Sequence, residues 1–172
     1  MNNLYFIAVL PDMVIRNEVM DFKIIAKEKF KSSKALNSPA HITIVPPFKS
    51  TYEKEKEIIH SLNNLLNNTK EFYITLNGFN RFDKNVIFVD VEKNEDLFHV
   101  KEKVVDLIKV IVPEIENMTT KFRPHITVAF RDLKKEMFDE AWDYFSKIDY
   151  FRIFKFDNIT LLRHNGEKWK IV

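Results

Sequence analysis

The stretch Pro39-Ala40-His41-Ile42-Thr43-Ile44-Val45 has a near-copy 84 residues further along the chain, Arg123-Pro124-His125-Ile126-Thr127-Val128-Ala129. Each copy is a short apolar run around a His-x-Thr triplet, and its β-branched residues are typical of a β-strand. Side chains alternate faces along a strand, so the His and the Thr of a triplet share one face and their aliphatic neighbours share the other. We therefore expect two motif strands that each present an imidazole beside a hydroxyl.

The segments around the two motif strands also correspond. Apolar residues at helical spacing predict helices over residues 12–30 and 97–111, which precede the motif strands, and over residues 52–66 and 134–147, which follow them. Further strands are predicted at residues 4–10 and 86–91, and at residues 72–79 and 156–163. The chain is thus predicted to contain two pseudo-repeat lobes, each running strand, helix, motif strand, helix, strand.

Length and composition favour one compact domain. The 172 residues are 45% hydrophobic and include 16 phenylalanines, which is enough for a sizeable core. Only two glycines and six prolines are present, and no Ser-rich or Pro-rich stretch forms a linker. We therefore treat residues 1–172 as a single domain made of two lobes.

Composition also excludes several classes of function. The absence of cysteine excludes disulfides, thiolate catalysis and cysteine-ligated metals. Because the only glycines are Gly78 and Gly166, neither a Walker loop nor a dinucleotide-binding fingerprint can be assembled. A net charge of +2 suits a nucleotide or a short RNA end better than a long duplex. No signal peptide or membrane-spanning run is recognisable, so cytoplasmic residence is expected.

The paired triplets indicate acid–base chemistry if their strands face one cleft. Two imidazoles and two hydroxyls then surround one substrate, which suits a phosphodiester that is attacked on one side and leaves from the other. His41, Thr43, His125 and Thr127 are the candidate catalytic residues. The alternatives to a catalytic role are that the histidines only bond to neighbouring backbone, or that they form a zinc site together with a carboxylate. Metal ligands at tight spacing flank neither triplet, and Asp132 is the nearest acid to the second, so no metal or cofactor is predicted.

Three further residues are candidate substrate contacts, each with an ordinary structural alternative. Phe48 follows the first motif strand and could stack on a base, or could belong to the core. Arg131 could neutralise a phosphate oxygen, or could be an exposed residue of a strand-to-helix turn. The hydroxyl of Tyr5 could reach the cleft, although aromatic strand residues more often serve packing. No role is predicted for the remaining histidines, which lie in helical or turn-like surroundings without a partner pattern: His60, His99 and His164.

These motifs resemble those of the two-histidine phosphoesterase superfamily, which includes 2′-5′ RNA ligase-like proteins and cyclic nucleotide phosphodiesterases and is defined by paired His-x-Thr/Ser motifs. The resemblance covers nearly the whole chain, and it is carried by four segments: Tyr5–Pro11, His41–Phe48, the second triplet after Arg123-Pro124, and the closing strand, turn and strand over residues 159–172 around Gly166.

The resemblance implies an α+β fold in which two antiparallel sheets face a central cleft and the helices lie outside. It also implies chemistry without a metal on RNA 2′,3′-cyclic phosphates, 2′-5′ linkages or small cyclic phosphates. Separately, we expect a monomer with no membrane contact and no obligate protein partner. His41 and His125 would be the acid and the base, and Thr43 and Thr127 would hold the phosphate. The family often has an arginine at the position of Phe130, whereas the arginine here is Arg131.

Our hypothesis from the sequence is a metal-independent phosphoesterase in which His41 is the acid and His125 is the base during hydrolysis. Because the same arrangement works in reverse, a 5′-hydroxyl in place of water would give a ligase reaction. Two other functions remain open: a non-catalytic module that binds RNA or nucleotides in the same cleft, and a metal-dependent hydrolase with the histidines as ligands.

Overall fold

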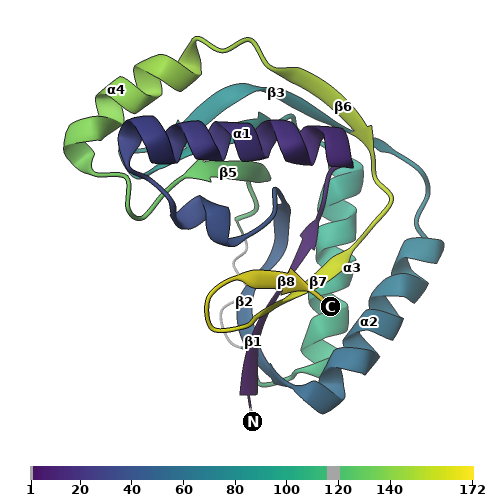
Figure 1. Ribbon diagram of the computed structural model, residues 1–172. Helices are drawn as coiled ribbons and strands as arrows, with labels where there is room; N and C mark the ends of the chain where they lie inside the picture. Colours follow the sequence, from purple (N-terminus) through teal and green to yellow (C-terminus); the bar gives the residue numbers. More distant parts are fainter. Residues whose placement is uncertain (1, 116–120) are drawn as a thin grey trace.

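The computed structural model describes residues 2–115 and 121–172 (Figure 1). The strands are β1 (Asn2–Val9), β2 (Ile42–Thr51), β3 (Tyr73–Phe82), β4 (Val86–Val91), β5 (His125–Ala129), β6 (Phe151–Lys155), β7 (Thr160–His164) and β8 (Trp169–Ile171). The helices are α1 (Met13–Phe30), α2 (Tyr52–Asn67), α3 (Glu95–Ile111) and α4 (Lys135–Ser146), with a short 3-10 helix η1 (Lys34–Asn37). The four predicted helices agree with the observed ones to within two residues at each end.

The strands form two four-stranded antiparallel sheets, which confirms the predicted α+β class. The first sheet has the strand order β2-β1-β7-β8, and the second has the order β5-β4-β3-β6. The motif strands β2 and β5 occupy one edge of each sheet and contact each other. The closing strand, turn and strand predicted around Gly166 are present as β7 and β8.

The two sheets are related by pseudo-symmetry, and each takes strands from both halves of the chain. Each sheet places its motif strand beside the first strand of the same half, and then takes its third strand from the other half. Thus β3, from the first half, pairs with β4, while β7, from the second half, pairs with β1. The halves therefore exchange strands, and neither sheet is complete without both.

The strand predicted over residues 156–163 is wrong at its beginning, and β6 was not predicted. The chain leaves the second sheet after Lys155 and enters the first at Thr160. Between them, the amide of Asn158 donates to the carbonyl of Leu10 at 2.7 Å and its oxygen accepts from the Leu10 N–H at 2.9 Å. The side chain of Asn158 thereby occupies the backbone N–H and C=O of Leu10, and the chain crosses from β6 in the second sheet to β7 in the first at this residue.

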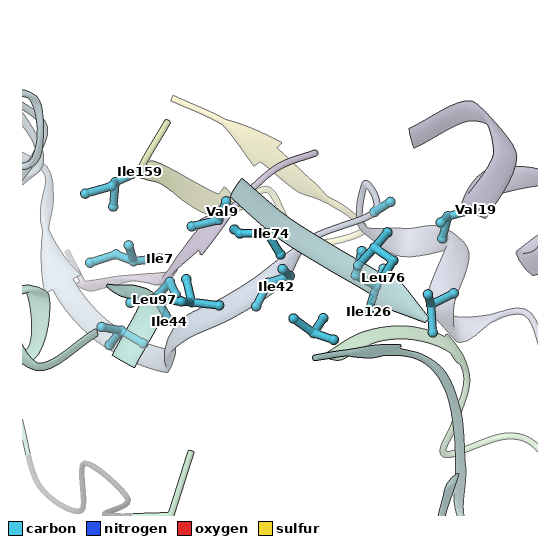
Figure 2. Close-up of a cluster of buried hydrophobic side chains, with 14 of the residues drawn as sticks. Ile7, Val9, Val19, Ile42, Ile44, Ile74, Leu76, Leu97, Ile126 and Ile159 are labelled. Atoms are coloured by element: carbon cyan, nitrogen blue, oxygen red, sulfur yellow. The ribbon is translucent and has the colours of Figure 1, made fainter. Parts of the chain in front are cut away.

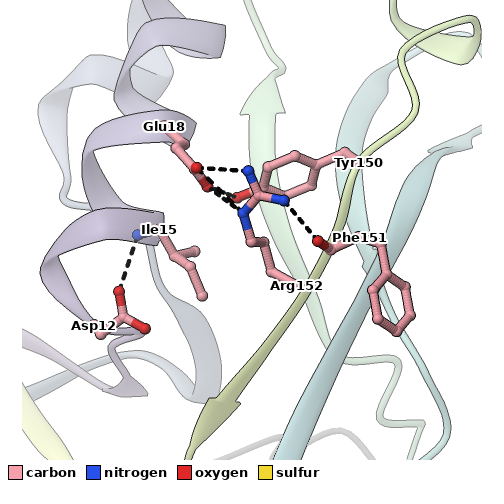
Figure 3. A network of polar contacts seen from close by, with 6 residues as sticks. All are labelled: Asp12, Ile15, Glu18, Tyr150, Phe151 and Arg152. Carbon is pink, nitrogen blue, oxygen red and sulfur yellow. Dashed lines mark hydrogen bonds and ion pairs between the residues drawn. The ribbon is translucent and has the colours of Figure 1, made fainter.

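The helices cover the sheets from outside and also cross between halves (Figure 1). Helix α1 contacts β5 and α4, whereas α3 contacts β2 and α2. The side chain of Asp12 caps α1 by accepting from the N–H of Ile15 at 3.0 Å. Glu18 then binds Arg152 of β6 through two short bonds and accepts the hydroxyl of Tyr150 at 2.8 Å (Figure 3). This network fixes α1 against the far edge of the second sheet.

A continuous hydrophobic core joins the inner faces of both sheets to the helices (Figure 2). Fully burying one isoleucine or leucine stabilises a fold by about 1.5–3 kcal/mol, so this shared core links the sheets strongly. No helix within the described ranges is long and apolar enough to cross a membrane. The labelled core side chains of Figure 2 come from both sheets, from α1 and α3, and from the residue before β7: Ile7, Val9, Val19, Ile42, Ile44, Ile74, Leu76, Leu97, Ile126 and Ile159.

Candidate active site

The two His-x-Thr triplets are arranged as strand alternation predicts. Their aliphatic neighbours Ile42, Ile44, Ile126 and Val128 point into the core and are at most 2% exposed. The histidines and threonines of both triplets point to the opposite face and are only partly buried. Because β2 and β5 contact each other, these four polar side chains lie at the junction between the sheets.

Each imidazole is oriented by the same hydrogen bond. Nδ1 of His41 lies 2.7 Å from the carbonyl oxygen of Pro39, and Nδ1 of His125 lies 2.8 Å from that of Arg123. A carbonyl oxygen can only accept, so each Nδ1 carries the hydrogen and donates it. In the neutral ring Nε2 is therefore the basic nitrogen, which is the state that a general base requires.

An aromatic ring from the neighbouring strand packs against each imidazole. The ring centroids of Phe6 and His41 are 4.7 Å apart, and those of Phe88 and His125 are 4.9 Å apart. Phe82 adds an edge-on contact with His125 at 5.0 Å. These rings restrict the imidazoles and remove water from one side of each, which disfavours the charged form.

Burial lowers the pKa of both histidines, and their neighbours modify this effect differently. The pKa of His41 falls from 6.5 to about 4, mainly through burial, with further lowering by the charges of Lys23 and His125. Burial also lowers the pKa of His125, and the charge of Arg123 lowers it further, but the Asp90 carboxylate raises it. His41 is thus neutral at pH 7 in the free protein.

A cavity of about 380 Å³ opens between the sheets at this junction. Its size lies within the range of small-molecule sites. His125 lies beside it and lines a smaller adjoining hollow of about 140 Å³, and Thr43 lines both spaces. The larger cavity is lined by Leu4, Phe6, Ala35, Ser38, His41, Thr43, Pro47, Thr127, Phe130, Arg131, His164 and Trp169.

Two of the predicted substrate contacts lie outside the cavity. Tyr5 is fully buried on the core face of β1, where its hydroxyl donates to Glu55 at 2.9 Å. Phe48 is also buried in the core, with its ring centroid 6.1 Å from that of Tyr5. Strand alternation explains the correction, because Phe6 rather than Tyr5 faces the cavity, as Pro47 does in place of Phe48.

Arg131 does line the cavity, in an unusual backbone conformation. Its φ of 54° lies in the left-handed region, which residues other than glycine rarely adopt. The next residue, Asp132, accepts bonds from the hydroxyl of Ser32 at 2.9 Å and from the N–H groups of Ser33 and Lys34 at 2.8 and 3.0 Å. This clamp stabilises the turn that directs Arg131 into the cavity, one position later than the family's usual arginine.

Sequence reasoning missed three aromatic residues of the cavity wall and one buried lysine. His164, set aside as lacking a partner pattern, lies with Trp169 at 4.9 Å between centroids, and Phe6 packs on Trp169 at 4.5 Å. The alternation of β1 would have identified Phe6, but the pairing of β7 with β1 was not foreseeable. Lys23 is 2% exposed, and its ammonium donates to the carbonyl of Ser38 at 2.9 Å.

The described residues offer no group of three or more His, Asp or Glu side chains placed to hold a metal ion. The acids nearest the motifs have other partners. Asp90 accepts from Asn80 at 2.9 Å and lies 3.6 Å from Arg123, and Asp132 forms the clamp above. What the site does offer is two oriented imidazoles, two threonines and one arginine.

A family model described as the 2′-5′ RNA ligase superfamily matches residues 11–168, nearly the whole chain. The chain belongs to this superfamily. The expected resemblance to two-histidine phosphoesterases is therefore confirmed, and membership supports an enzyme of the phosphoesterase type. A search of curated proteins by sequence finds no match.

Solved structures of the superfamily fold resemble this one over almost their full length. E. coli LigT complexed with 3′-AMP has a TM-score of 0.66 at 16% identity, covering 100% of this chain and 95% of LigT. TT0787 of Thermus thermophilus has a TM-score of 0.66 at 14% identity, with 98% and 94% covered. The MHV ns2 PDE domain has a TM-score of 0.59 at 13% identity, with 97% and 94% covered. At these identities the similarity establishes the fold.

Proposed function

We propose that this member of the 2′-5′ RNA ligase superfamily is a metal-independent phosphoesterase that acts on a 2′,3′-cyclic phosphate or a 2′-5′ phosphodiester of RNA or a small nucleotide. The observation that carries the proposal is the matched pair of imidazoles. Both donate from Nδ1 to a backbone carbonyl and keep Nε2 for chemistry, one in the cavity and one beside it. General acid–base catalysis on a phosphodiester needs two such groups.

In the proposed reaction, one neutral imidazole takes a proton from a water molecule while the oxygen of that water attacks phosphorus. The other imidazole, protonated at Nε2, gives its proton to the departing ribose oxygen, so the products are a phosphomonoester and a free hydroxyl. Thr43 and Thr127 donate to the non-bridging oxygens, and Arg131 adds positive charge, both of which matter most as negative charge builds on those oxygens.

The surroundings of the two rings favour an assignment opposite to that made from the sequence. His41 is the more suitable base, because burial and Lys23 lower its pKa and keep it neutral. His125 is the more suitable acid, because the Asp90 carboxylate opposes the lowering of its pKa by burial and by Arg123. Among the described residues, no carboxylate raises the pKa of His41 in this way. A phosphate anion in the cavity raises both pKa values and brings the acid closer to neutral pH.

A nucleotide suits the cavity because aromatic rings and polar groups lie at opposite parts of its wall. Phe6, His164 and Trp169 offer faces and edges against which a base can pack. Thr43, Thr127 and Arg131 supply the donors that a phosphate requires. LigT, which shares the fold, has been crystallised with 3′-AMP, with ATP and with NADP+.

The test is turnover of a nucleoside 2′,3′-cyclic phosphate and of a 2′-5′-linked dinucleotide in the presence of EDTA. His41→Ala and His125→Ala should each lower kcat by about 10²-fold or more, the usual size of an acid–base contribution. His60→Ala is the matched control, because this ring lies on α2, outside both spaces, and contacts Asn64 on the same helix.

Each alternative function gives a different result. Binding of nucleotides without turnover by the wild-type protein would support a non-catalytic module. Activity that is lost in EDTA and restored by a divalent metal would support a hydrolase that uses the histidines as ligands. Full activity in either alanine variant would exclude the acid–base mechanism.

A further inference from the structure

The second hollow, beside His125, has a composition different from that of the main cavity. It is lined by three cationic side chains, Lys101 of α3 and Lys121 and Arg123 of the segment before β5. Its remaining wall is largely apolar, with Ile44, Pro46, Val105 and Phe122. Within the described residues that form it, none is acidic. For a chain with a net charge of only +2, this is a local concentration of positive charge.

We propose that this hollow is a second phosphate subsite, in which Lys101, Lys121 and Arg123 bind the phosphate next to the scissile one in an oligonucleotide substrate. This inference rests on the proposed function for the identity of the scissile bond. It adds that the substrate extends beyond one nucleotide, on the His125 side of the reacting phosphorus.

Position is the first argument. Thr43 lines both spaces, His41 lines only the larger and His125 only the smaller. A substrate phosphate held by the threonines therefore lies beside both spaces, and the next phosphate of an oligonucleotide, which is one nucleoside away along the chain, can enter the second space. The larger space, at about 380 Å³, suits a nucleoside, whereas the smaller, at about 140 Å³, suits a compact group such as a phosphate.

The electrostatics of the hollow are the second argument. An apolar wall lowers the local dielectric constant, so an anion interacts more strongly with the three cations here than on an open surface. The guanidinium of Arg123 lies 5.5 Å from the rings of Phe82 and Phe88 and 3.6 Å from Asp90, and the ammonium of Lys101 lies 5.8 Å from the ring of Phe122. These contacts hold Arg123 and Lys101 in place before a ligand arrives.

The experiment compares kcat/KM for a nucleoside 2′,3′-cyclic phosphate with that for a trinucleotide ending in the same group. The Lys101→Gln/Lys121→Gln double variant should lose roughly tenfold on the trinucleotide and less than about twofold on the mononucleotide, because only the former has a second phosphate. Its salt dependence on the trinucleotide should flatten by about 0.7 per contact removed, as expected for single strands. Arg123 is left intact because the charge of its side chain lowers the pKa of His125, so its replacement would also change the proposed catalytic group.

The matched control is Lys103→Gln/Lys109→Gln, which removes the same charge from exposed positions of α3 outside the hollow. Equal losses on both substrates, or an equal loss in the control, would overturn the subsite. If the wild-type protein turns over neither substrate, the proposed function fails and the subsite is tested by binding alone. Calorimetry with a trinucleotide 2′-phosphate should then show weaker binding by the hollow variant than by the control, and equal affinities would refute it.

Discussion

Replacing Lys23 with methionine should stabilise the protein at neutral pH, although a hydrogen bond is lost. Lys23 is 2% exposed, and its ammonium donates to the carbonyl of Ser38 at 2.9 Å. Within residues 2–115 and 121–172, no carboxylate forms an ion pair with it. Burial lowers its pKa from 10.5 to about 8, because the charged form has lost its water without gaining a counter-ion.

The free-energy cost of burying the charged Lys23 side chain follows from its pKa values in the unfolded and folded states. Their difference corresponds to about 3 kcal/mol, at 1.36 kcal/mol for each pKa unit. Below pH 8 the lysine is charged in both the folded and unfolded states, so the folded state carries the whole penalty. Between pH 8 and 10.5 the unfolded chain binds more protons, and stability therefore rises with pH until the penalty has disappeared.

Methionine has a similar volume and no charge, so Lys23→Met removes the penalty and loses only the bond to Ser38. That bond is worth about 1 kcal/mol. The variant should therefore be more stable than the wild type by about 2 kcal/mol at pH 7, and it should lose this advantage as the pH approaches 10.5. The reversal with pH distinguishes a buried charge from a simple packing effect.

Urea unfolding at pH 7 and at pH 10 measures both free energies, with Lys27→Met as a control at an exposed position of the same helix. The buried charge of Lys23 does not destabilise the fold as proposed if Lys23→Met is less stable than the wild type at pH 7. The same holds if the difference in unfolding free energy between the two proteins is equal at both pH values. Because the charge of Lys23 lowers the pKa of His41, an NMR titration should also show the His41 pKa rising in the variant. An unchanged His41 titration would show that Lys23 does not influence the pKa of this imidazole.

Three further predictions concern groups around the phosphate site. Thr43→Ala and Thr127→Ala should each lower kcat by about 10²-fold with little change in KM, whereas the serine variants should keep most of the activity, since only the hydroxyl is needed. Asp132→Ala leaves the N–H groups of Ser33 and Lys34 without their acceptor, so the free energy of unfolding should fall by about 1–3 kcal/mol. KM should also rise, because the turn no longer directs Arg131 into the cavity, and an unchanged KM would contradict this role of Asp132. Asp90→Asn should lower the pKa of His125 in an NMR titration and shift the high-pH limb of the kcat profile downwards, while the His41 titration stays in place.

Sequence patterns predicted the parts of this fold that depend on local periodicity. The helices, β4 and the faces of His41 and His125 follow from spacing alone, because one side of each element must be buried. The exchange of β3 and β7 between sheets does not follow, since pairing depends on which distant strand lies alongside. β6 was missed because it is an edge strand whose Phe151 and Ile153 are about half exposed, so its pattern lacks clean alternation.

The same limit applies to the candidate site. The triplets identified the two histidines and two threonines, and proximity in sequence identified Arg131. Tyr5 and Phe48 were misplaced because the sequence alone does not show which face of β1 and β2 turns to the cavity, and in the structure strand alternation puts both side chains on the core face. Trp169 and His164 could not be assigned, because only the pairing of β7 with β1 brings them to the cavity.

The pseudo-symmetry of the fold explains why the two histidines could not be told apart from their motifs, and its breaking explains how they can act differently. Phe6 and Phe88 occupy equivalent places under the two imidazoles, and two residues later the chain has Ala8 on the His41 side but Asp90 on the His125 side. Lys23 adds its positive charge near His41 alone. Lys23 lowers the pKa of His41, whereas at His125 the Asp90 carboxylate opposes the lowering by Arg123, so the difference between the two surroundings favours the proton on His125. In the proposed mechanism, this difference makes His41 the base and His125 the acid.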